Sequence, residues 1–142
     1  MRHRISGVTL MELMIVMVIV GILAAIAYPS YRSTILKSSR ADAKIAISQA
    51  VQELEKCFTR NNTYLQSLPT QPCSTSAALL GAGSTSPGGK YLVTGAITAL
   101  AYTISATPQL GQADDTQCGT FTLDEKSVRG KTGTLTAAEC WK

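Results

Sequence analysis

The sequence has few residues that could form a catalytic or metal-binding centre. It contains a single histidine, His3, which lies in a short basic stretch, residues 1–7, before a long apolar run. If that stretch is removed during maturation, no histidine remains for a Ser–His or Cys–His pair or for a His-ligated metal site. The sequence also lacks a C-x-x-C spacing and a glycine-rich phosphate-binding loop. We therefore expect no enzymatic activity, no metal and no other cofactor.

Charge is also scarce in the apolar run that follows this stretch. Residues 8–28 carry one charged side chain, that of Glu12. As a helix, an apolar run of this length spans about 30 Å, the thickness of the hydrocarbon core of a bilayer. We expect residues 8–29 to form a transmembrane helix. A carboxylate in such a segment costs a few kcal/mol unless it has a partner. We therefore expect the Glu12 carboxylate to pair with a cation.

Two ordinary explanations also fit the hydropathy of this run. One is a secretory signal with an A-x-A cleavage site at residues 25–27, and the other is a plain single-span anchor. Neither accounts for Glu12 or for Gly7, which immediately precedes the run. Because Arg2 and Arg4 lie before the run, the positive-inside rule predicts a cytoplasmic N-terminus and an extracytoplasmic remainder of the chain.

All the cysteines lie downstream of the apolar run, at Cys57, Cys73, Cys118 and Cys140. An even number of cysteines in a small extracytoplasmic domain predicts disulfides, here with three possible connectivities. We favour Cys57–Cys73 and Cys118–Cys140, because each pair closes a segment rich in glycine, serine and threonine. Each closure stabilises the fold by about 3 kcal/mol. The alternative, a zinc site made of all four cysteines, lacks the usual ligand spacing.

After Pro29 the pattern becomes amphipathic and predicts that the helix continues over residues 30–60. One apolar stripe recurs at helical spacing, formed by Ala43, Ile47, Val51, Leu54 and Phe58. The other faces carry Arg40, Lys44, Gln52, Glu53 and Lys56. Asn61 and Asn62 are suitable residues for a helix end. The stripe predicts that this half of the helix covers a sheet, whereas the first half must be covered by lipid or by other subunits.

The rest of the chain predicts a loop followed by an antiparallel sheet. Residues 61–89 are rich in proline, serine, threonine and glycine and are expected to form a loop, with one helical turn at 77–80. Strands are expected at residues 90–94, 100–107 and 119–124, where apolar and polar residues alternate. The sheet and a disulfide-bounded region would occupy residues 90–142. We therefore expect an α+β head domain, residues 30–142, with a long N-terminal helix packed on three to four antiparallel strands.

The N-terminal residues resemble the class III signal of type IV pilins and pseudopilins. Gly7, the run Val8-Thr9-Leu10-Met11-Glu12, then Pro29 and Tyr31 carry the resemblance. It implies that a prepilin peptidase removes the leader, residues 1–7, and that the amine of Val8 is methylated. It also implies that Glu12 meets the N-terminal amine of a neighbouring subunit in the fibre, and that the helix from Gly21 through Pro29 can unwind on assembly. The subunit would lie in the inner membrane before assembly, with a periplasmic head, and then in an extracellular pilus.

Later segments resemble minor pilins of the PilE and ComP group. These segments are residues 115–124, the stretch Asn61-Asn62-Thr63-Tyr64 and the closing Cys140-Trp141. The resemblance implies the pilin fold and a structural subunit that assembles with other pilins in pilus biogenesis, adhesion and twitching motility.

Two alternative functions remain open. A DNA receptor for natural transformation would use Lys126, Arg129 and Lys131, with Lys90 and Lys142 as possible neighbours, although no aromatic residue interleaves this cluster. A pseudopilin of a type II secretion system could bind calcium through Asp114, Asp115, Asp124 and Glu125. That spacing matches no calcium loop with defined ligand positions, and such acidic pairs are more often turn residues.

Overall fold

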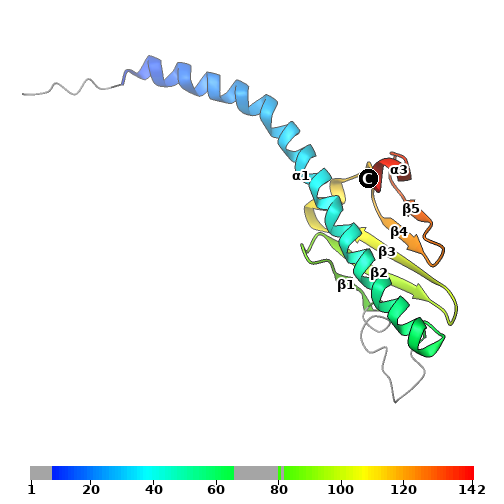
Figure 1. Cartoon of the computed structure of the whole chain (residues 1–142). Coiled ribbons are helices and arrows are strands. Elements are labelled where there is room, and N and C mark those ends of the chain that lie inside the picture. Colours follow the sequence, from blue (N-terminus) through cyan, green and yellow to red (C-terminus); the bar gives the residue numbers. More distant parts are fainter. Residues whose placement is uncertain (1–7, 66–79, 81) are drawn as a thin grey trace, which may run out of the picture. The chain divides into compact units, whose positions relative to one another are not determined.

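The computed structural model describes residues 8–65, 80 and 82–142 (Figure 1). Along the chain its elements are α1 (Leu10–Asn61), β1 (Ser84–Thr85), β2 (Tyr91–Ile97), β3 (Tyr102–Pro108), the 3-10 helix η1 (Leu110–Asp114), β4 (Phe121–Asp124), β5 (Arg129–Lys131) and α3 (Ala137–Cys140). The chain divides into two compact units, Met1–Ile35 and Leu36–Lys142, and α1 contributes to both.

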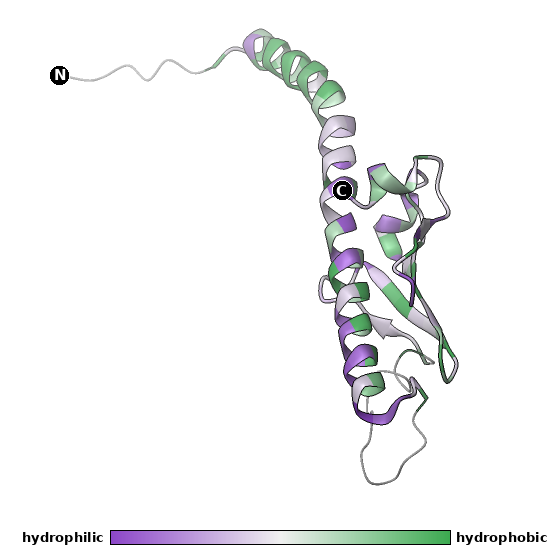
Figure 2. Cartoon of the chain, turned by 45° about the vertical axis from the view of Figure 1, so that its right-hand side comes forward, coloured by the Kyte–Doolittle hydropathy of each residue, from purple (hydrophilic) through white to green (hydrophobic). Residues whose placement is uncertain are grey.

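The first unit consists of the apolar part of α1. In Figure 2 most of this part of the helix has the green of hydrophobic residues. Its large apolar side chains are all exposed, from 40% at Ile35 to 75% at Leu10. By length and composition the helix could cross a membrane. Thr9 caps the start of the helix, because its Oγ1 accepts a hydrogen bond from the backbone N–H of Glu12 at 3.2 Å. The helix passes through Pro29 without interruption.

The second unit is an α+β domain in which the rest of α1 covers one face of an antiparallel sheet (Figures 1 and 2). The strand order is β1-β2-β3-β4-β5, so each strand pairs with the next along the chain. Side chains from α1 and the sheet form one core, whose fully buried members include Ala43, Ile47, Leu54, Tyr91, Ile104 and Phe121. The predicted alternation in β3 is confirmed, because Tyr102, Ile104 and Ala106 face this core.

The sheet has five strands, so the prediction of three to four was slightly too low. β1 falls within the predicted loop 61–89, and β5 falls in the C-terminal segment. Both strands are very short, and their sequences show no alternation of apolar and polar residues. They form because a neighbouring strand supplies hydrogen-bond partners, as in the register Ser84↔Val93. The helical turn predicted at 77–80 lies mostly outside the described residues.

The predicted end and apolar stripe of α1 are both confirmed. Asn62 has a φ of 54°, the left-handed conformation that terminates helices, and its N–H donates to the carbonyl oxygen of Phe58 at 2.8 Å. In the stripe, Ala43, Ile47 and Leu54 are buried, while Val51 and Phe58 are partly buried against the core. The amphipathic pattern therefore placed the helix on the sheet correctly.

Two isoleucines on α1 provide a matched test of this packing. Ile47 is 0% exposed and Ile45 is 52% exposed. We expect Ile47→Ala to lower the free energy of unfolding by about 2–5 kcal/mol, because it leaves a cavity in the core. Ile45→Ala should change it by less than about 0.5 kcal/mol. Denaturation of the full-length protein in detergent, followed by near-ultraviolet circular dichroism, measures both, and equal losses would contradict the assigned helix face.

Candidate functional site

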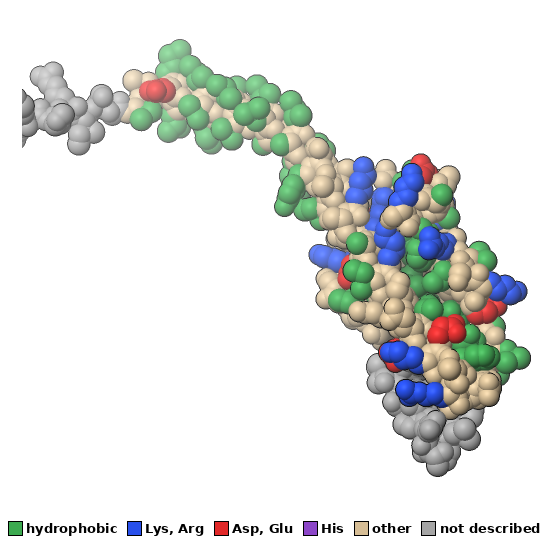
Figure 3. All heavy atoms as spheres, in the orientation of Figure 1, with side chains coloured by type: hydrophobic (Ala, Val, Ile, Leu, Met, Phe, Trp, Pro, Cys, Tyr) green, Lys and Arg blue, Asp and Glu red, His purple; other side chains and the backbone are tan. Residues whose placement is uncertain are grey.

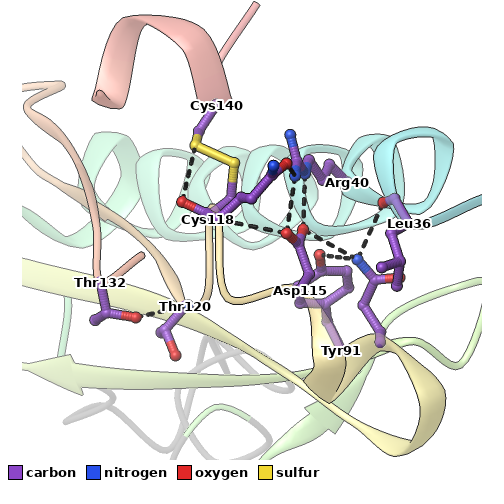
Figure 4. A network of polar contacts seen from close by, with 10 residues as sticks. Leu36, Arg40, Tyr91, Asp115, Cys118, Thr120, Thr132 and Cys140 are labelled. Atoms are coloured by element: carbon purple, nitrogen blue, oxygen red, sulfur yellow. Dashed lines mark hydrogen bonds and ion pairs between the residues drawn. A yellow bond between two sulfur atoms is a disulfide. The ribbon is translucent and has the colours of Figure 1, made fainter. Parts of the chain in front are cut away.

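A buried ion pair joins α1 to the loop between β3 and β4 (Figure 4). Arg40 Nε donates to Asp115 Oδ2 at 2.7 Å, and Arg40 Nη2 donates to Asp115 Oδ1 at 2.8 Å. Arg40 Nη2 also donates to Gln117 Oε1 at 2.9 Å. Arg40 is 8% exposed and Asp115 is 2% exposed. This bidentate geometry is the strongest form of a charged hydrogen bond, and it fixes the loop on the helix.

Gln112 extends this network to the backbone of α1. Its Nε2 lies 3.1 Å from the carbonyl oxygen of Leu36, 3.0 Å from Tyr91 Oη and 3.3 Å from Asp115 Oδ2. Burial raises the pKa of the Tyr91 phenol to about 12, although the hydrogen bond from Gln112 acts in the opposite direction. The backbone N–H of Cys118 donates to Asp115 Oδ1 at 3.3 Å. The network therefore connects α1, β2 and the start of the disulfide-bounded region.

Sequence reasoning missed this network. The helical pattern predicts Arg40 on a polar face of α1, and the acidic pair predicts Asp115 as a turn residue or a calcium ligand. The available signal is the position of Arg40 three residues before Ala43 and seven before Ile47, which extends the buried stripe by one helical turn. Within the part of the chain that the structure describes, no cluster of three His, Cys, Asp or Glu side chains could hold a metal ion.

The disulfide predicted between Cys118 and Cys140 is confirmed (Figure 4). Cys57 is also disulfide-bonded. Its predicted partner, Cys73, lies outside the described residues, so the pairing Cys57–Cys73 stays a prediction.

The helix that carries Cys140, α3, begins with a capping box. The backbone N–H of Thr136 donates to Glu139 Oε2 at 2.9 Å, and the N–H of Glu139 donates to Thr136 Oγ1 at 3.3 Å. The hydrogen bonds from Thr136 lower the pKa of the Glu139 carboxyl. This cap orders α3 and therefore the end of the chain that follows it.

The three basic residues proposed to contact DNA lie together on the β4–β5 hairpin. Lys126 is in the turn, which Asp124 stabilises because its Oδ1 accepts hydrogen bonds from the N–H groups of Lys126 and Val128 at 3.0 and 2.8 Å. Asp124 is thus a turn residue, as the simpler interpretation had it. Arg129 and Lys131 lie on β5, and Lys131 Nζ donates to the carbonyl oxygen of Gly133.

An aromatic residue lies beside this cluster in space, although none interleaves it in the sequence. The guanidinium carbon of Arg129 is 5.5 Å from the ring centroid of Trp141. This contact could not be predicted from the sequence, because α3 and its disulfide separate Arg129 from Trp141 along the chain. In space, the C-terminal segment returns to the edge of the sheet formed by β5, and Trp141 Nε1 donates to the carbonyl oxygen of Gly130 at 3.0 Å.

Further basic side chains continue from this edge across the end of the chain. Lys44 Nζ, from α1, donates to the backbone oxygen of Lys142. Figure 3 shows Lys and Arg side chains gathered on this part of the visible face. We call Lys44, Lys126, Arg129, Lys131 and Lys142 the basic surface. Lys90 precedes β2, which β3 and β4 separate from β5 in the sheet, so we leave it out of the basic surface.

Comparisons with known proteins decide the family. Residues 29–122, well over half of the chain, match the family described as type IV minor pilin ComP, DNA uptake sequence receptor. The chain belongs to this family of minor type IV pilins. Residues 2–28 match the prokaryotic N-terminal methylation motif. Among solved structures, a type IV pilin from Shewanella oneidensis is 26% identical, with a TM-score of 0.44, over 71% of this chain and 97% of that chain.

The family assignment selects among the alternatives left open by the sequence. The chain is a minor type IV pilin of the ComP kind. This family match favours a pilin over the alternative of a type II secretion pseudopilin. The matched residues include α1 from Pro29, the Arg40–Asp115 pair and the first residues of β4. The hairpin cations and Trp141 lie beyond the matched residues, so their role rests on their geometry in this pilin.

The ion pair of this pilin yields a test of stability with an internal control. Asp115→Ala leaves the charge of Arg40 buried without its counter-ion, and we expect a loss of about 3–5 kcal/mol in the free energy of unfolding. Glu53→Ala removes an ion pair on the surface of α1. In this pair Lys56 Nζ lies 2.7 Å from Glu53 Oε1, and both side chains are more than half exposed. That change should cost less than about 1 kcal/mol. Urea denaturation of both variants checks this, and a mild effect of Asp115→Ala would show that the pair is dispensable.

Proposed function

We propose that this minor pilin is synthesised as a precursor, cut by a prepilin peptidase between Gly7 and Val8, and methylated on the Val8 amine. Before assembly, residues 8–29 anchor it in the inner membrane, with the head in the periplasm. It then enters an extracellular pilus with other pilin subunits. The match of residues 2–28 to the methylation motif and the apolar character of the helix support this sequence of events.

The observation that carries the assembly step is the exposed apolar surface of α1. Among the residues that the structure describes, nothing covers the large apolar side chains between Val8 and Ile26. Such a surface is stable only in lipid or against other apolar helices. Moving from lipid into a bundle of similar helices keeps the surface away from water. It also brings the Glu12 carboxylate close to the Val8 amine of a neighbouring subunit, where the two charges neutralise each other.

Substitution of Glu12 separates membrane insertion from assembly. We expect Glu12→Leu to leave the protein inserted in the membrane but to lower its amount in filaments at least about tenfold, because the neighbouring amine loses its counter-ion. Met14→Leu, a change of similar volume two residues away, should assemble normally. Immunoblots of sheared filaments and of membranes measure both pools. Normal incorporation of Glu12→Leu would reject the charge pairing.

We further propose that the head binds duplex DNA through the basic surface. The family is described as a DNA uptake sequence receptor, and this chain supplies five cations on α1, β5, the hairpin turn and the C-terminus. Cations on such a surface contact phosphates and release counter-ions from the DNA. The hairpin presents three of them, Lys126, Arg129 and Lys131, on a fixed backbone, since Asp124 stabilises its turn and β5 is paired with β4. The rigid backbone lowers the ordering cost of binding.

This proposal predicts a strong dependence on salt. For the full-length protein in neutral detergent, the logarithm of the DNA-binding constant should fall linearly with the logarithm of salt concentration. Lys126→Ala combined with Lys131→Ala should weaken binding and reduce this slope by about 0.9 for each DNA phosphate that the variant no longer neutralises. Lys56→Ala, on α1 and outside the basic surface, should leave affinity and slope unchanged. No binding at low salt would reject a DNA-binding role.

A further inference from the structure

The chain contains one tryptophan, Trp141, and it lies against one cation of the basic surface. We propose that Trp141 is a positioning residue for Arg129, which it holds in the orientation that meets DNA phosphate, and that Trp141 itself makes no contact with DNA. This inference rests on the DNA-binding function proposed above. It assigns to the C-terminal Cys-Trp pair a role in recognition beyond closing the fold.

Trp141 is held from several directions. Its indole Nε1 donates to the carbonyl oxygen of Gly130 on β5 at 3.0 Å. Its backbone N–H donates to the carbonyl oxygen of Ala137 at 2.9 Å. Its ring meets the fully buried ring of Phe121 edge to face, at 5.5 Å between centroids and 80° between planes. The residue before it, Cys140, is bonded to Cys118. The indole is therefore fixed relative to both strands of the hairpin.

Arg129 gains its orientation from this fixed ring. The side chain is exposed on β5, where a free arginine would sample many rotamers. A cation 5.5 Å from the ring centroid is attracted by the negative face of the indole, which restricts the guanidinium to fewer orientations. Less conformational entropy is then lost when the guanidinium donates to a phosphate. The five N–H donors of an arginine exceed what one aromatic face engages, so donors remain for a phosphate.

The other two hairpin cations do not share this contact with the ring. Lys131 Nζ donates to the carbonyl oxygen of Gly133, and Lys126 lies in the turn at the opposite end of β5 from Gly133. An effect of Trp141 on DNA affinity should therefore pass through Arg129 alone. This specificity distinguishes a positioning role from a general loss of structure or from direct stacking of Trp141 on a base.

A double-mutant cycle on the full-length protein in detergent tests the proposal. The probe is a fluorescein-labelled duplex DNA of mixed sequence, followed by anisotropy over a series of salt concentrations. We expect Trp141→Leu to weaken binding about two- to fivefold, the factor that corresponds to a cation–π contact at an exposed site. In the Arg129→Ala background the same change should have no effect. In the Lys126→Ala background it should cost the full factor.

Equal weakening by Trp141→Leu in the presence and absence of Arg129 would overturn the positioning role, and so would no weakening at all. Because the leucine variant could disturb the hairpin, Trp141→Phe provides a second test: it keeps a ring against Phe121 and should retain part of the coupling to Arg129. Arg129→Lys keeps the charge but loses the planar group, and it should bind more weakly than the unmodified protein.

The fluorescence of the sole tryptophan separates this inference from the function on which it rests. Arg129→Ala should shift the emission of Trp141 in the absence of DNA, because it removes the cation from the ring, whereas Lys126→Ala should not. If the emission of Trp141 does not shift in Arg129→Ala, the contact between Arg129 and Trp141 is contradicted. A shift without any salt-dependent DNA binding by the unmodified protein would confirm the contact but reject the DNA function, and with it the recognition role of Trp141.

Discussion

The constraint on which the rest of this protein depends is an apolar helix whose large side chains lie exposed among the described residues. From Val8 to Ile26 the large apolar side chains are more than half exposed, and Glu12 is the only charged residue among them. Water disfavours such a surface strongly, so the subunit must occupy lipid or a bundle of similar helices. Membrane anchoring and assembly therefore both depend on the exposed surface of one helix.

Within the head, the Arg40–Asp115 pair links the helix to the disulfide-bounded C-terminal region. Asp115 accepts hydrogen bonds from Arg40, from Gln112 and from the N–H of Cys118, the residue that forms the disulfide with Cys140. Contacts therefore run from α1 through the disulfide to Trp141 and Arg129 at the edge of the sheet. A buried charge pair adds little net stability compared with apolar packing, but loss of one partner is costly. The pair thus makes the position of the C-terminal region dependent on the helix that enters the filament.

Local patterns predicted the elements of this fold well, whereas its long-range contacts stayed hidden. The apolar run, the stripe from Ala43 to Phe58 and the alternation in β3 depend on periodicity, which a single segment reveals. Arg40 and Asp115 are 75 residues apart, and no local pattern relates them. The strand β5 forms only because β4 lies beside it, and Trp141 reaches Arg129 only after α3 and the disulfide turn the chain back. Residues whose roles depend on tertiary pairing were therefore the ones missed.

Intact mass spectrometry of filaments sheared from cells, without reduction, tests the central claim most directly. That claim is that the subunit matures by cleavage after Gly7 and enters the pilus through the exposed helix. The predicted mass is that of residues 8–142 plus one methyl group and minus four hydrogens for two disulfides. A protein that is absent from filaments and found in the medium with Tyr28 at its N-terminus would contradict the claim, because an ordinary signal peptidase would then have removed the helix.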